Sequence, residues 1–150
     1  MHPINLTAVT ALTLSLALAL FSTPALAEVS ADVPDSNQSM QPLVTYHEAM
    51  SYLLGRNGKP KSAEKAAELF QSLAEKNWSS AQQMLGHMYY EGKGVEKNDL
   101  LAYKWLSLAA RNNARLAEDI GSRRRQLQNQ IPLHSLQQVD KWIAEWQPES

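Results

Sequence analysis

The chain has 150 residues, a formal net charge of −1 and no cysteine. A charge so close to zero gives no electrostatic reason for bulk binding to nucleic acid or to an anionic membrane surface. The lack of cysteine excludes a disulfide framework and thiol chemistry, so packing alone must stabilise a folded domain.

Residues 1–27 are expected to be a cleaved signal peptide. They contain no Asp, Glu, Lys or Arg, and an apolar run at residues 8–21 is followed by Pro24 and by an A-L-A sequence that ends at Ala27. An apolar segment, a helix breaker and an A-x-A site in this order are typical of secretory signals. The alternative is an uncleaved anchor, but the run is shorter than the roughly 20 apolar residues that span a bilayer. We therefore expect cleavage after Ala27 and a periplasmic or secreted protein.

Residues 28–42 are expected to be a flexible linker. The segment is polar, contains Pro34 and Pro42, and shows no helical or strand periodicity. Such a segment buries too little apolar surface to offset the conformational entropy that is lost on ordering. The alternative is a docking segment that folds on a partner.

Residues 43–150 are expected to form a helical domain that begins with two related units, at about residues 45–79 and 80–113. A shift of about 35 residues without gaps relates the two units. This shift pairs Ala67 with Ala102, Phe70 with Trp105, Tyr46 with Ala81, Met50 with Leu85, Leu54 with Tyr89 and Ser51 with Gly86. The first unit departs most from the pattern, as terminal repeats often do because one of their sides faces solvent.

The second unit predicts two short antiparallel helices joined by a glycine turn. Apolar residues recur every three or four positions in both halves, which is the period of an amphipathic helix. Gly92 suits a left-handed helix C-cap, and Gly94 permits a second sharp bend. Asn98 can cap the second helix, and Asp99 lies at the positive end of its dipole.

This second unit resembles the Sel-one-like repeat (SLR) family, a relative of the tetratricopeptide solenoids. The motif positions are Ala81, Leu85, Gly86, Tyr89, Gly92, Gly94, Val95, Asp99, Ala102, Trp105, Ala109 and Ala110. The resemblance implies an all-α fold, a short right-handed α/α solenoid of two SLR units with a C-terminal pair of capping helices. It also implies binding to other proteins rather than catalysis.

The capping helices are expected at about residues 114–147. Helical spacing continues to about Gln130, and the Ile131-Pro132 pair then ends the helix because proline removes an amide and restricts the residue before it. The last helix ends in Glu145-Trp146, which is similar to the ending of bacterial SLR proteins.

The residues that most resemble catalytic or metal-binding groups favour structural roles. Ser62 and Lys65 fit an S-x-x-K pattern, but the partner motifs are absent and Ser62 fits a helix N-cap. His87 and Glu91 offer two ligands where zinc needs three or four. Arginines 123–125 point to different sides of a helix and are expected to form a solvated face paired with Glu118 and Asp119; the alternative is a site for an anionic partner. We expect no catalytic residue, cofactor or metal.

The resemblance implies that the first helix of each unit lines the concave face of the solenoid, so the candidate binding surface is a groove along these helices. On a helical wheel, Gln83, His87 and Tyr90 lie opposite the stripe that packs on the second helix. The ungapped shift adds Glu48 and Tyr52 from the first unit. Tyrosines among adaptable polar groups suit protein recognition, although an ordinary hydrated helix face has the same composition. Tyr103 and Lys104, on the outer helix, are expected to be dispensable for folding and binding.

The sequence therefore predicts an exported, non-enzymatic adaptor or scaffold that binds a protein or peptide partner in the bacterial envelope. The alternatives are an inhibitor or accessory subunit of an envelope enzyme, and an enzyme. Nucleic acid is not expected as a partner, and no membrane span is expected after the leader is removed.

Overall fold

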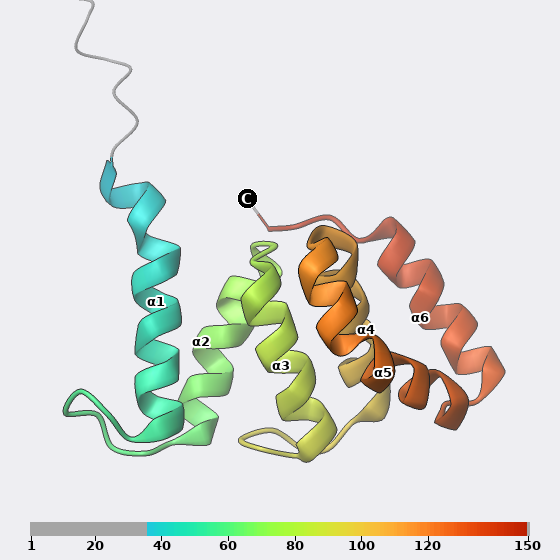
Figure 1. The fold of residues 1–150 in the computed structure, drawn as a ribbon, viewed down its shortest axis with the longest axis horizontal. Coiled ribbons are helices and arrows are strands. Elements are labelled where there is room, and N and C mark those ends of the chain that lie inside the picture. Colours follow the sequence, from blue (N-terminus) through green and yellow to red (C-terminus); the bar gives the residue numbers. More distant parts are fainter. Residues whose placement is uncertain (1–35, 150) are drawn as a thin grey trace, which may run out of the picture. The chain divides into compact units, whose positions relative to one another are not determined.

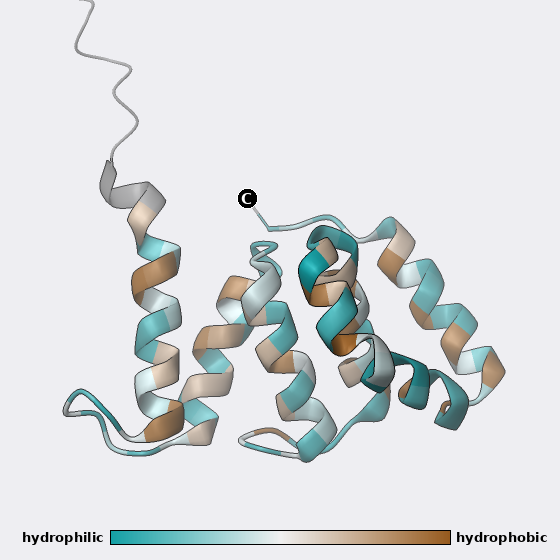
Figure 2. Ribbon diagram, viewed as in Figure 1, coloured by the Kyte–Doolittle hydropathy of each residue, from teal (hydrophilic) through white to brown (hydrophobic). Residues whose placement is uncertain are grey.

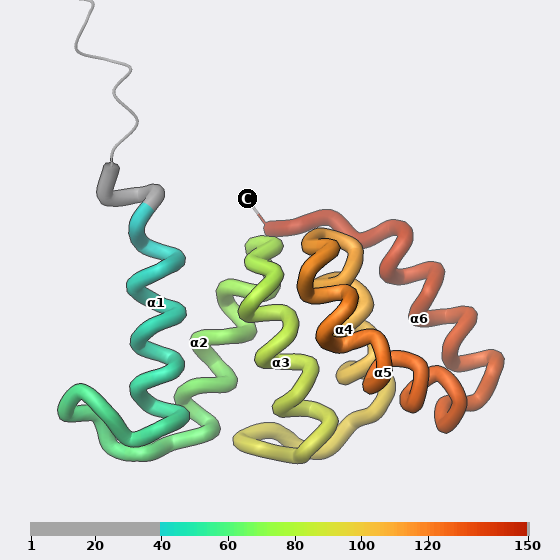
Figure 3. The backbone as a smooth tube through the Cα atoms, viewed as in Figure 1, coloured from blue at the N-terminus to red at the C-terminus, as the bar shows by residue number. Residues whose placement is uncertain are grey.

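The computed structural model describes the backbone of residues 36–149, and within this range it contains six helices and no strand (Figure 1). The helices are α1 (Ser36–Leu54), α2 (Ala63–Glu75), α3 (Ser79–Glu91), α4 (Asp99–Asn112), α5 (Ala114–Gln130) and α6 (Leu133–Glu145). Successive helices lie side by side and reverse direction, as the tube in Figure 3 shows. The fold is thus an all-α solenoid of helix pairs, as predicted. The expected leader and residues 28–35 of the expected linker lie outside the described residues.

The end of the expected linker is helical rather than flexible. Helix α1 begins at Ser36 and contains Pro42, so the prediction of a linker up to residue 42 is wrong for residues 36–42. Pro42 is the seventh residue of α1, so the helix continues across it with one backbone hydrogen bond missing. The apolar spacing of Met40, Leu43 and Val44 extends the helical period across it.

Polar caps and left-handed turns set the ends of the helices. The Ser62 side chain accepts a hydrogen bond from the amide of Lys65, and Asn98 accepts one from the amide of Leu101. Each bond satisfies an amide that the first turn of a helix leaves free. Gly92 ends α3 with a positive φ of 67°, which L side chains rarely adopt.

The turns show that the two repeat units are related by a gapped shift, and that the ungapped shift is wrong. Gly55 has a φ of 66°, close to the 67° of Gly92. The carbonyl of Tyr52 accepts from the amide of Ser62 at 2.9 Å, and the carbonyl of Tyr89 accepts from the amide of Asn98 at 2.9 Å. Tyr52 therefore corresponds to Tyr89, because the stretch from the glycine to the capping residue is one residue longer in the first unit.

The same correction applies to the small residues at the helix contacts. When the two units are aligned with this one-residue gap, called the gapped register below, Ala49 rather than Ser51 corresponds to Gly86. The side chain of Ala49 is fully buried. Counting from the caps, Ala66 rather than Ala67 corresponds to Ala102, and both are 0% exposed.

The core consists of two clusters of buried side chains that meet at α4. The first cluster joins α1, α2, α3 and α4, and the second joins α4, α5 and α6. Trp105 and Leu108 of α4 belong to the first cluster, whereas Leu106 and Ala109 belong to the second. Helix α4 is thus apolar on two sides, and Figure 2 shows apolar and polar residues alternating along all the helices.

After α6 the chain returns across α4 toward the end of α2. The amide of Glu149 donates a hydrogen bond to the carbonyl of Glu75 at 2.9 Å, and Figure 3 shows this return of the tail. Trp142 and Trp146 pack against the first cluster. The C-terminal segment therefore ties the capping helices to the first repeat unit.

At Gly86 the backbone of α3 packs directly against Leu106 of α4. A Cβ atom at this position would lie 2.7 Å from Cγ of Leu106, well inside van der Waals contact. We predict that Gly86→Leu destabilises the domain by about 1–3 kcal/mol, because the larger side chain forces the helices apart. Gly121→Ala is the matched control: the nearest atom, Nη1 of Arg125, is 3.9 Å away. It should stabilise the domain by about 0.5–1 kcal/mol through helix propensity. Equal melting temperatures for the two variants would contradict the contact.

Candidate protein-binding surface

Tyr90 forms the centre of a cationic and aromatic cluster between α3 and α5. Its half-buried ring lies 4.1 Å from Cζ of Arg123, measured to the ring centroid, and 5.7 Å from Nζ of Lys97. A cation over an aromatic face is attracted by the ring quadrupole. Arg123 comes from α5 and Lys97 from the turn before α4, so three segments meet at this ring.

His87 lies one turn before Tyr90 on α3 and is half-buried. Burial lowers the pKa of His87 below its usual value, the charge of Arg123 lowers it further, and Glu91 opposes the shift. The imidazole is therefore neutral at neutral pH and can donate or accept a hydrogen bond. Gln83 precedes it by a further turn and is also half-buried.

Glu48 and Tyr52 form a separate cluster at the end of α1. Nζ of Lys59 lies 2.9 Å from Oε1 of Glu48 and 5.1 Å from the ring centroid of Tyr52. The hydrogen bond and the charge of Glu48 raise the pKa of Lys59. This cluster holds the turn after α1 against the helix.

The structure therefore does not place the five candidate groove residues on equivalent helix faces. In the gapped register, Tyr52 corresponds to the packed Tyr89, and Met50 and Leu53 occupy the positions of His87 and Tyr90. Leu53 is 5% exposed, so this part of the face is buried in the first unit. The candidate surface that remains is Gln83, His87 and Tyr90, with Arg123 and Lys97.

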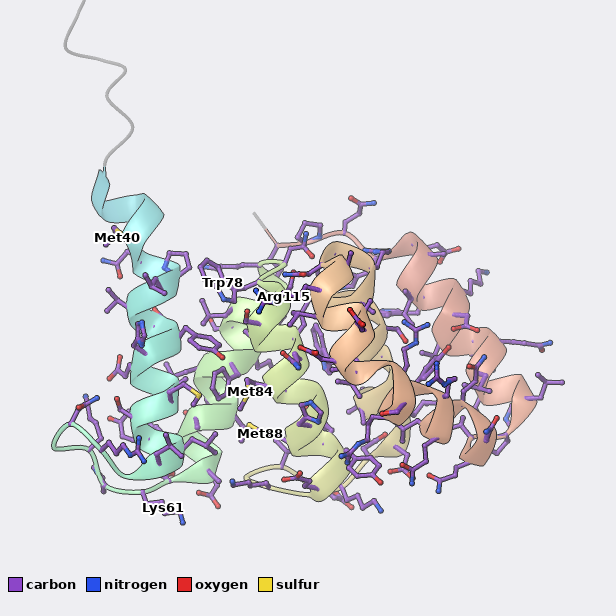
Figure 4. All side chains as sticks on the ribbon, in the orientation of Figure 1. Met40, Lys61, Trp78, Met84, Met88 and Arg115 are labelled. Atoms are coloured by element: carbon purple, nitrogen blue, oxygen red, sulfur yellow. The ribbon has the colours of Figure 1, made fainter. Side chains whose placement is uncertain are left out.

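The other side of α3 is occupied by the core. Met88 is 2% exposed in the first cluster, and Met84 packs against that cluster. Figure 4 shows both methionines on the side of α3 that faces α2. This packing fixes the rotation of α3, and with it the direction of His87 and Tyr90.

Tyr103 and Lys104 are structural, and the prediction that they are dispensable for folding is wrong. Tyr103 is 6% exposed, and its hydroxyl donates to Oδ1 of Asp140 at 3.0 Å. Nζ of Lys104 lies 3.4 Å from the ring centroid of Trp142 and 4.8 Å from that of Trp105. Burial lowers the pKa of Lys104. Helix α6 covers both residues, and the four-residue spacing of Trp142 and Trp146 was the sequence signal for this cover.

The motifs that resembled catalytic and metal sites have structural partners. Oγ of Ser62 accepts from the amide of Lys65 at 3.1 Å, so this serine is a helix cap as predicted. In residues 36–149, no three His, Asp or Glu side chains gather in a way that could hold a metal ion. Arg123 stacks on Tyr90 instead of belonging to a purely solvated face. No helix within the described range has the length and apolar character that crossing a membrane requires.

Comparison with protein families identifies the repeats. The Sel1 repeat model matches residues 49–78 and residues 79–113. This chain carries two Sel1 repeats. The resemblance based on the second unit is thereby confirmed, and the match includes the degenerate first unit. A search of curated proteins gave no significant match.

Two solved structures with Sel1-type folds are similar to this chain. One is a protective antigen present in uropathogenic Escherichia coli strains that displays an SLR fold, with a TM-score of 0.58 and 26% identity. The other is a Sel1 repeat protein from Oxalobacter formigenes, with a TM-score of 0.51 and 30% identity. The matches cover 69% and 59% of this chain but only 22% and 37% of those proteins. The likeness thus concerns the repeat fold.

The environment of His87 in the second Sel1 repeat predicts a pH dependence of stability. The pKa of His87 in the folded chain lies below the usual value of about 6.5. Below that pH, His87 therefore binds a proton more readily in the unfolded chain than in the folded chain. The contribution of His87 is therefore fully present above pH ~6.5 and is lost as the pH falls toward the folded pKa. We predict that His87→Gln loses less melting temperature between pH ~7.5 and ~5.5 than the wild type. Identical losses in thermal melts monitored by circular dichroism would contradict this assignment.

Proposed function

We propose that this chain is an exported, non-enzymatic adaptor that binds a protein or peptide partner in the bacterial envelope. Sel1 repeats typically form scaffolds for protein–protein interaction, which supports the binding role. The observation that carries the proposal is the cluster around Tyr90, where a half-buried aromatic ring is flanked by two cations at the junction of three segments.

The chemistry of this cluster defines the partner that it fits. Tyrosine and arginine are the residues that most often dominate the energy of protein interfaces. Arg123 and Lys97 favour a partner segment that carries carboxylates, and the neutral His87 can form a hydrogen bond with the backbone of that segment. We therefore propose an acidic peptide or an acidic loop of a folded protein as the ligand.

The non-enzymatic part of the proposal is supported by the roles of the candidate residues. Sel1 repeat proteins are generally non-catalytic adaptors. The serine of the S-x-x-K pattern caps α2. His87 is half-buried, and burial together with the charge of Arg123 lowers its pKa.

The envelope location rests on the composition of residues 1–27. We predict that the protein recovered after expression of the full sequence begins at Glu28 and fractionates with the periplasm or the medium. Intact-mass spectrometry of each fraction measures this directly. A protein that retains Met1 and remains with the cytoplasm would refute the location while leaving the binding proposal open.

The binding proposal predicts that folding and binding can be separated. Tyr90→Ser with Arg123→Ala should lose at least tenfold in partner affinity, a loss of about 1.4 kcal/mol or more, while the protein stays folded. The charge of Arg123 should also make binding weaker at higher salt. The measurement is crosslinked capture from envelope extract, followed by titration of the captured protein against both variants.

The matched control is Lys141→Ser with Leu133→Ala, which changes two exposed side chains of α6 and none of the residues of the cluster. This pair should bind as the wild type does. Loss of binding in the control but not in the Tyr90 pair would place the interface elsewhere.

A further inference from the structure

The cluster around Tyr90 contains one group that changes its charge near neutral pH. His87 lies one turn before Tyr90 on α3, and both side chains are half-buried. Cζ of Arg123 lies 4.1 Å from the centroid of the Tyr90 ring, and Nζ of Lys97 lies 5.7 Å from it. Lys97 approaches Asp99 only loosely, with 3.9 Å between Nζ and Oδ1. Arginine and lysine stay charged near neutral pH, whereas histidine titrates there. Protonation of His87 therefore adds a third positive charge to this surface.

His87 and Arg123 have no carboxylate partner within the described part of the chain. The ion pairs in residues 36–149 include neither side chain. The pairing expected between Arg123 and the acidic residues of α5, Glu118 and Asp119, is therefore not formed. The guanidinium of Arg123 stacks on Tyr90 instead, which leaves its N–H groups available to a carboxylate from outside the chain.

The charged groups that act on His87 come from two helices. Arg123 of α5 opposes protonation of the imidazole, and Glu91 of α3 favours it. Burial is the largest influence and acts in the same direction as Arg123, so the pKa of His87 is lowered. Among the described residues, neither α2 nor α4, which also pack against α3, contributes a charge that shifts this pKa. A proton on His87 thus lacks a nearby negative charge that would stabilise it.

We propose that His87 makes this surface pH-sensitive, so that an acidic partner binds more tightly once His87 is protonated. The inference rests on the proposed function, because it assigns a regulation to the same acidic ligand. In the free chain, protonation places a third positive charge beside Arg123 in a half-buried position. A partner carboxylate at this surface supplies the missing negative charge. The protonated imidazole donates from both ring nitrogens, and a charge-assisted hydrogen bond is about twice as strong as a neutral one.

Thermodynamic linkage fixes the sign of the effect. Because the bound carboxylate favours protonation of His87, protonation favours binding by the same factor. Binding therefore raises the pKa of His87 from its lowered value in the free chain. Affinity begins to increase as the pH falls through the pKa of the complex, and the increase is complete below the pKa of the free chain. Burial of the ring by the partner acts in the opposite direction, but much of that cost is already present in the free chain, whereas the carboxylate is new.

The inference is tested by fluorescence anisotropy on the protein expressed from the full sequence, with a labelled hexa-aspartate peptide as the probe. The aspartate side chain has a pKa of about 3.9, so the probe stays ionised between pH ~7.5 and pH ~5.5. At constant ionic strength, we expect the affinity to rise about threefold to tenfold as the pH is lowered over this interval, because a change of about one in pKa corresponds to a factor of about ten.

The variant His87→Gln separates this residue from the other groups that titrate. It keeps a polar side chain but cannot be protonated in this range, so it should lose most of the rise in affinity while its melting temperature at pH ~7.5 shows that it is folded. The matched controls are His47→Gln and His134→Gln, which remove the exposed histidines of α1 and α6. Both controls should keep the rise that the wild type shows.

The pKa of His87 is measured directly by NMR titration of its imidazole Cε1 proton, with the spectrum of His87→Gln used to assign the signal. A saturating concentration of the peptide should raise this pKa. By linkage, the rise should account for the ratio of the affinities at the two pH values. A pKa that falls or stays unchanged when the peptide binds would overturn the inference.

Failure of the pH coupling can be distinguished from failure of the proposed function. Peptide binding that is lost in Arg123→Ala but does not depend on pH would overturn the coupling and leave the proposed function in place. A pH dependence that His87→Gln retains would do the same. A peptide that binds at neither pH would remove the acidic ligand from the proposed function, and the coupling with it.

Discussion

The contact between Gly86 and Leu106 is the constraint on which the arrangement of the helices depends. A glycine at this position lets the backbone of α3 approach α4 until the Leu106 side chain occupies the space of the missing Cβ. Leu106 then reaches the second core cluster, and the adjacent Trp105 belongs to the first. One close contact therefore fixes α4 between the two clusters. Interiors packed at crystal-like density do not absorb even one additional methylene group without strain.

The candidate binding surface is a consequence of this packing. Because α3 is held against α4, and α4 against α5, Tyr90 meets Arg123 from the second helix along the chain. The same packing half-buries His87 and lowers its pKa. The surface is thus presented mainly by two packed helices, α3 and α5, with Lys97 added from the turn before α4. A pre-organised surface of this kind loses little conformational entropy on binding.

The sequence predicted the helices and the second repeat well, because caps and small residues act locally. It failed in aligning the first unit. The ungapped shift paired Tyr52 with His87, whereas the hydrogen bond from the Ser62 amide to the Tyr52 carbonyl makes Tyr52 the counterpart of Tyr89, off the face of His87 and Tyr90. It also failed for Tyr103, because the helix that buries this side chain lies 37 residues further along the chain. Periodicity within one helix defines its apolar face, but the partners of a second face come only from tertiary packing.

The most direct test of the account is a double-mutant cycle on Gly86→Ala and Leu106→Ala, with stability measured by chemical denaturation. Gly86→Ala alone should destabilise the domain, because the new Cβ meets Leu106 at 2.7 Å. In the Leu106→Ala background the clash is removed, so the same change should be neutral or stabilising. The account predicts a coupling free energy of about 1–2 kcal/mol. Additive effects within about 0.5 kcal/mol would contradict it.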